Sequence, residues 1–111
     1  MHYSFREEND VLVVNIKEKR ATVEFAGVLK QELMEKIEGQ YKNVVINLSD
    51  TDFVDSSFLG TLVAGLKKAT MHNGDLKIVG LQPPVKAMFE LTRLYKIFDI
   101  FDTVEEAIKS F

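Results

Sequence analysis

Two hydrophobic patterns alternate along this chain, and their alternation restricts the possible folds more than any other feature. Short runs rich in Val, Ile and Leu occur at residues 11–16, 44–48 and 76–79, each with a single polar residue. Such runs are typical of strands that are covered on both faces. Between the first two runs, residues 23–38 place an apolar side chain at every fourth position and end before Gly39, which predicts an amphipathic helix.

The remaining N-terminal segments fit the same alternation. Tyr3 and Phe5 alternate with polar residues, and turn-forming residues follow at 8–10, so the first strand is expected to form a hairpin with residues 11–16. Residues 49–55 are polar and are predicted to form a loop. A second helix is expected to begin near Ser57, and its buried face is expected to consist of Leu59, Leu62, Val63 and Leu66.

The C-terminal part continues with helix, strand and helix. Pro83 and Pro84 open a predicted helix with one apolar face, made of Val85, Met88, Phe89 and Thr92. Residues 97–101 alternate as a short strand. Asp102 or Thr103 is expected to cap a last helix, which buries Val104, Ala107, Ile108 and Phe111.

The element order is therefore β-β-α-β-α-β-α-β-α. Strands that alternate with helices favour an α/β fold with a mixed, mostly parallel sheet covered by helices. The chain of 111 residues is long enough for one ordinary core and shows no linker or repeat, so residues 1–111 are predicted to form a single domain.

Composition excludes several classes of function. The 17 acidic and 14 basic residues are spread along the chain and give a net charge of -3, so no nucleic-acid partner is expected. The longest apolar stretch, residues 58–66, is far shorter than the roughly 20 residues of a membrane span. No secretory signal pattern is present at the N-terminus, and there is no cysteine, which together predict a cytoplasmic protein without disulfides.

Residues for catalysis are scarce. His2 and His72 are expected to be solvated surface side chains and not bases, and the chain has neither a Gly-x-Ser-x-Gly elbow nor a glycine-rich phosphate cradle. We therefore predict no enzyme activity, no cofactor, no metal site and no useful affinity for ATP or GTP.

The most informative segment lies between the predicted strand at 44–48 and the helix that follows. Asp55 or Ser56 is suited to cap this helix, because side-chain oxygens accept hydrogen bonds from the free N–H groups of a first turn. A helix N-terminus also tolerates an added phosphate dianion, so a hydroxyl here is a good phosphorylation site. A phosphate on Ser56 would add negative charge beside Asp52 and Asp55 and would repel an acidic or apolar partner surface.

Two motifs resemble those of one family. Asp55-Ser56-Ser57 followed by Leu59-Gly60 is similar to the Asp-Ser-Ser-Gly-Leu-Gly signature of bacterial anti-sigma factor antagonists, which belong to the STAS domain family. The stretch that begins Pro84-Val85-Lys86 and ends Tyr95-Lys96-Ile97 resembles a helix and the following strand of the same family. Together with the element order, the resemblance covers nearly the whole chain and implies a STAS-like fold.

The resemblance also implies a function and its residues. In that family, the serine directly after the aspartate is phosphorylated by an anti-sigma factor that is itself a serine kinase, and a serine phosphatase reverses the mark. The matching residue is Ser56. The unphosphorylated antagonist sequesters the anti-sigma factor and frees a sigma factor, so the domain is a protein-binding switch without catalysis of its own.

Two positions depart from the family pattern. Phe58 stands where many relatives have glycine, and it is expected to be half-exposed and to contact the partner next to Asp52, Asp55, Ser56 and Ser57; peripheral packing is the alternative. The family's Gly-(Asp/Glu)-(Leu/Ile)-Asp stretch is replaced by Lys19-Arg20-Ala21-Thr22, so that Thr22 stands where relatives have a site-shaping Asp.

Two other functions compete with this one. A STAS module can instead serve another signalling assembly or a transporter complex. A receiver-like phospho-acceptor of doubly wound type is less well supplied, because acidic residues for a magnesium site are missing after the early strand at 11–16. The oligomeric state is not predicted by any of these patterns.

Overall fold

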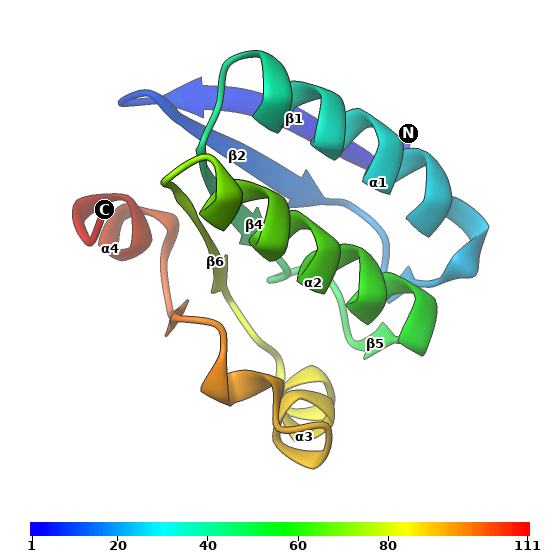
Figure 1. The fold of residues 1–111 in the computed structure, drawn as a ribbon. Coiled ribbons are helices and arrows are strands. Elements are labelled where there is room, and N and C mark those ends of the chain that lie inside the picture. Colours follow the sequence, from blue (N-terminus) through cyan, green and yellow to red (C-terminus); the bar gives the residue numbers. More distant parts are fainter.

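A five-stranded sheet with the strand order β1-β2-β4-β6-β7 runs through the molecule (Figure 1). The computed structural model describes residues 1–111. The strands are β1 (Tyr3–Glu8), β2 (Val11–Ile16), β4 (Asn43–Asn47), β6 (Asp75–Val79) and β7 (Ile100–Phe101). β1 is antiparallel to β2, and every other neighbouring pair is parallel. The predicted α/β fold with a mixed, mostly parallel sheet is confirmed.

Helices cover both faces of this sheet, which explains why its inner strands β2, β4 and β6 lack polar alternation. The helices are α1 (Val23–Gly39), α2 (Ser56–Met71), α3 (Pro83–Leu91) and α4 (Val104–Lys109). α1 and α2 lie side by side on one face, and α4 lies apart from them (Figure 1). In β2, Leu12 and Val14 belong to the main core with α1 and α2, whereas Val11 and Val13 pack in a second cluster with α4. No helix has the length and apolar character that crossing a membrane requires.

α1 and α2 approach each other closely because α2 places small residues on the inner side. A Cβ on Gly65 would lie 2.8 Å from the Leu76 side chain and 2.9 Å from that of Leu33. Nearby, the buried hydroxyl of Thr61 donates a hydrogen bond of 3.1 Å to the backbone oxygen of Ala26 in α1. The two helices therefore pack as one unit, and their N-terminal ends are held in a fixed relation.

The buried face of α2 differs from the predicted one. The residues that face the core are Phe58, Leu59, Thr61, Leu62, Gly65 and Ala69. Val63 and Leu66 were expected on this face but are only half-buried. The prediction was wrong because it followed the large apolar side chains, whereas the closest helix packing occurs over Gly65 and Ala69.

The C-terminal expectations need three further corrections. The predicted strand at 97–101 contracts to β7, because Leu94–Lys96 form a short 3-10 helix, η1, and Ile97 is 50% exposed. Thr92 follows the last residue of α3 as its C-cap and is exposed, and its hydroxyl donates a hydrogen bond to the backbone oxygen of Met88. Phe111 is also exposed, although its ring lies 4.4 Å from the ammonium of the buried Lys77.

One buried tyrosine predicts how stability changes at high pH. Desolvation raises the pKa of Tyr3 from 10.0 to about 12, and a hydrogen bond to the Glu32 carboxylate adds to the effect. The folded protein therefore retains a proton that the unfolded chain loses near pH 10, so the stabilisation is complete below pH 10 and is lost as the pH rises towards 12. We expect the urea midpoint of the native protein to fall more steeply over this range than that of Tyr3→Phe. Parallel curves for the two proteins would contradict this prediction.

Candidate functional site

Two short strands absent from the sequence-based prediction join the starts of α1 and α2. β3 (Arg20–Ala21) and β5 (Phe53–Val54) pair in parallel, with Arg20 opposite Phe53 and Ala21 opposite Val54. The backbone oxygen of Lys19 also accepts hydrogen bonds from the N–H groups of Asp52 and Phe53, at 2.9 and 3.1 Å. The segment predicted as a free loop at 49–55 is thus fixed to residues 19–21.

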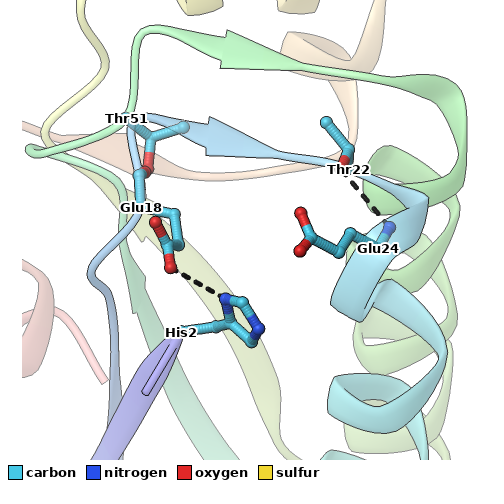
Figure 2. Close-up of polar contacts among 5 residues, drawn as sticks. All are labelled: His2, Glu18, Thr22, Glu24 and Thr51. Atoms are coloured by element: carbon cyan, nitrogen blue, oxygen red, sulfur yellow. Dashed lines mark hydrogen bonds and ion pairs between the residues drawn. The ribbon is translucent and has the colours of Figure 1, made fainter.

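Thr51 also fixes the segment at 49–55 to the chain before β3. Its side chain is wholly buried, and its hydroxyl donates a 2.8 Å hydrogen bond to the backbone oxygen of Glu18. Figure 2 shows Thr51 beside Glu18, with Thr22 and Glu24 at the start of α1. Nothing in the local sequence distinguishes Thr51 from other loop residues, so its role emerges only when residues 18 and 51 are brought together.

Asp55 connects the two helices directly. One carboxylate oxygen, Oδ1, accepts a hydrogen bond of 2.9 Å from the N–H of Phe58, which makes Asp55 the N-cap of α2. The other oxygen, Oδ2, accepts a hydrogen bond of 2.8 Å from the N–H of Val23, the first residue of α1. Of the two capping candidates, Asp55 and Ser56, the structure selects Asp55. The carboxylate lies at the positive ends of two helix dipoles, where a negative charge is stabilised.

Thr22 caps the neighbouring helix. Its Oγ1 accepts a hydrogen bond of 3.3 Å from the N–H of Glu24 (Figure 2). Threonine and aspartate both act as N-caps, so Thr22 can perform the capping that an aspartate at this position would perform, without its charge. Thr22 and Asp55 are therefore brought together at one end of the sheet, as neighbouring caps of parallel-packed helices.

Ser56 and Ser57 form the first turn of α2, and both are exposed. The side chain of Ser56 makes no hydrogen bond, while the backbone oxygen of Ser57 accepts one from Thr61. Both serines line a shallow depression of about 370 Å³ between α1 and α2. Its other lining residues are Val23, Ala26, Gly27, Lys30, Gly60 and Thr61.

Asp52 is exposed and lies before β5, outside this depression. Its carboxylate makes no hydrogen bond or ion pair, with Ser56 or with any other residue. Asp55 is thus the carboxylate fixed at the serines, and Asp52 contributes charge from the adjoining loop.

Phe58 does not lie on the surface of this site. The expectation of a half-exposed contact residue is wrong, because the side chain is fully buried and its ring packs edge-to-face on Phe25 of α1, with centroids 6.0 Å apart. The residue that replaces the glycine of the related signature therefore fills the space between the two helices. It does not contribute to the outer surface around Ser56 and Ser57.

The histidines differ from each other. His72 is exposed at the end of α2, as expected. His2 instead lies with its Nδ1 2.8 Å from Glu18 Oε2 (Figure 2). Its ring also stacks on that of Phe25, with the centroids 4.8 Å apart. No group of three or more His, Asp or Glu side chains lies close enough to hold a metal ion.

The site as a whole consists of hydroxyls, one carboxylate held by two backbone N–H groups, and two helix N-termini. This arrangement suits a phosphate acceptor and a docking surface.

Comparisons with known proteins match nearly all of the chain. The model of the STAS domain family matches residues 3–107. The anti-sigma-B factor antagonist of Bacillus subtilis is 34% identical over 95 residues, which cover 86% of this chain and 84% of that protein. A Thermotoga maritima protein, provisionally named an anti-sigma factor antagonist, is 29% identical over 101 residues, or 90% of this chain and 89% of its own.

The fold comparison gives the same family. The crystal structure of a Thermotoga maritima protein, also provisionally named an anti-sigma factor antagonist, superimposes with a TM-score of 0.88 at 25% sequence identity. The superposition covers 97% of this chain and 92% of that structure. The similarity therefore extends over the whole sheet and its helices and is not confined to the segment around Ser56.

Proposed function

Because this chain belongs to the STAS domain family, with relatives named anti-sigma factor antagonists, we propose that it is a phosphorylation-controlled antagonist of an anti-sigma factor. In its unphosphorylated form it binds an anti-sigma factor that is a serine kinase, and this binding frees a sigma factor. The kinase phosphorylates Ser56, which ends the complex, and a serine phosphatase restores it. The chain acts by binding alone and performs no catalysis.

The observation that carries this proposal is the position of Ser56. It is the first residue of α2, it is exposed, and its hydroxyl is not engaged in any hydrogen bond. The cap of α2 is supplied by Asp55, so the hydroxyl of Ser56 can be modified without loss of the cap. The helix dipole favours the negative charge that a phosphate would bring to this end.

The same geometry explains how the phosphate would prevent binding. A phosphate adds about 1.5 to 2 negative charges at pH 7 next to the carboxylate of Asp55. Asp55 cannot turn away, because both of its oxygens are held by backbone N–H groups. The partner surface that covers Ser56, Ser57, Gly27 and Gly60 in the unphosphorylated state would then face two adjacent anionic groups.

The first prediction concerns the modified residue. When the chain is incubated with its kinase-type anti-sigma factor, ATP and Mg²⁺, we expect one phosphate per chain, located on Ser56 by peptide mass spectrometry. Ser57→Ala is expected to be labelled as the native chain is, and Ser56→Ala is expected to stay unlabelled. A phosphate found on Ser57 of the native protein would overturn the assignment. Labelling of Ser56→Ala as well as of the native protein would do the same.

A binding measurement completes this test. Ser56→Ala should bind the anti-sigma factor as tightly as the unphosphorylated chain, while the phosphorylated chain should bind at least about tenfold more weakly. The free energy of unfolding of Ser56→Ala should stay within about 0.5 kcal/mol of the native value, since Ser56 is exposed and makes no cap. Equal affinity of the phosphorylated and unphosphorylated forms would contradict the switch.

A further inference from the structure

A second surface feature lies at the other end of α2, away from Ser56. Met71 ends the helix, and the rise of an α-helix places it roughly 22 Å from Ser56. Here the C-terminal half of α2 and the segment after η1 enclose an open groove of about 450 Å³. The groove is lined by Val63, Leu66, Lys67, Thr70, Met71 and Ile97.

The lining of this groove is mostly apolar and accessible. Met71 is 77% exposed and Ile97 is 50% exposed, while Val63 and Leu66 are half-buried beneath them. Val63, Leu66 and Met71 belong to α2 but lie outside its fully buried face. Methionine adapts its shape easily, and it is common on surfaces that accept a partner side chain.

Two exposed lysines belong to the groove lining or adjoin it in the sequence. Lys67 lines the groove, and Lys96 directly precedes Ile97 in the sequence.

These cations have no internal partner. Lys67 and Lys96 are exposed, and the four ion pairs of the structure involve other residues. The neighbouring Lys68 is different, since it pairs with Glu38 of α1. An apolar floor with unpaired positive charges at its side is complementary to an apolar stripe flanked by carboxylates.

We propose that this groove binds an acidic amphipathic helix of a partner protein. A helix is favoured over an extended strand because the groove is lined by side chains of α2 and Ile97, and no sheet edge is available there for pairing. The lining of α2 runs from Val63 to Met71, roughly 12 Å along the helix axis, so about two turns of a partner helix would span it. This contact is independent of Ser56 and of its phosphorylation.

A helical peptide library tests the proposal on the intact, unphosphorylated chain. Each peptide carries fixed leucines at helical spacing i, i+4, i+7 and i+11, and its other positions are drawn equally from Glu, Gln and Lys. We expect the peptides enriched by the native chain to be rich in Glu. These peptides should bind Lys67→Glu and Met71→Glu at least about tenfold more weakly than the native chain.

Two matched variants control for the added charge. Lys17→Glu makes the same charge change at an exposed lysine outside the groove, and Val28→Glu makes the same kind of replacement at an apolar residue of α1 that is 59% exposed. Both should bind the enriched peptides as the native chain does. All four replaced side chains are exposed, so unchanged melting temperatures are expected.

Several results would overturn the proposal. They are the absence of any enriched peptide, enrichment without preference for Glu, and equal loss of binding in Lys17→Glu. Sedimentation of the native chain alone gives another: self-association that disappears in Lys67→Glu would assign the groove to a second copy of this chain.

Discussion

Phe58→Ala is expected to lower the free energy of unfolding by about 3–5 kcal/mol. The side chain is fully buried, and its ring packs on Phe25, so its removal leaves a cavity between α1 and α2. These helices are held close by Thr61 and by the contacts of Gly65, which limits their ability to collapse into the cavity. Urea unfolding followed by circular dichroism measures the change, and the slope of the transition should stay the same.

Phe53 offers a matched control for this experiment. It is an aromatic residue in β5, five positions before Phe58, but it is 40% exposed, with the Arg20 guanidinium 4.1 Å from its ring centroid. Phe53→Ala should cost only about 1 kcal/mol, the range of an exposed cation–π contact. If Phe58→Ala were no more destabilising than Phe53→Ala yet lost binding to the anti-sigma factor, Phe58 would be a contact residue after all.

Asp55→Ala is expected to lower the free energy of unfolding by about 2–3 kcal/mol. Each of its carboxylate oxygens accepts a backbone N–H at the start of a different helix, and a capping bond of this type contributes about 1 kcal/mol. The charge adds to this, because it interacts with the dipoles of both α1 and α2. The loss is therefore larger than that of an ordinary N-cap.

Asparagine separates the two contributions. Asp55→Asn keeps one acceptor oxygen, but its amide nitrogen cannot accept the second N–H, so about half of the loss is expected. Asp52→Ala is the control, since this exposed carboxylate makes no bond and its removal should cost less than about 0.5 kcal/mol. Equal losses for Asp55→Ala and Asp52→Ala would show that the two hydrogen bonds accepted by Asp55 do not stabilise the fold.

The sequence predicted which residue types form the candidate site, but not which of them caps the helix. Local spacing indicates that a cap must stand at residue 55 or 56, because the strand at 44–48 and the helix after it leave room for one loop only. Which residue caps depends on a second acceptor contact, from Asp55 to Val23. These residues are 32 positions apart, and no local pattern reports their proximity.

The sequence alone determined the succession along the chain of the four helices and the five strands of the main sheet. Periodicities of two and 3.6 residues distinguish strands from helices within a short window, and a parallel connection has essentially one handedness. The confirmed helix at Val23–Gly39 and the strand at Asn43–Asn47 are examples of such locally encoded elements.

Only the tertiary structure decided which face of α2 is buried and what Phe58 does. A helical pattern counts large apolar side chains, but α2 turns Gly65 and Ala69 inward because small residues allow α1 and the sheet to come close. That rotation buries Phe58 against Phe25 and leaves Met71 exposed at the edge of a groove. The pairing of β3 with β5 was likewise undetectable, because two-residue strands have no period and exist only once their partner backbone is in place.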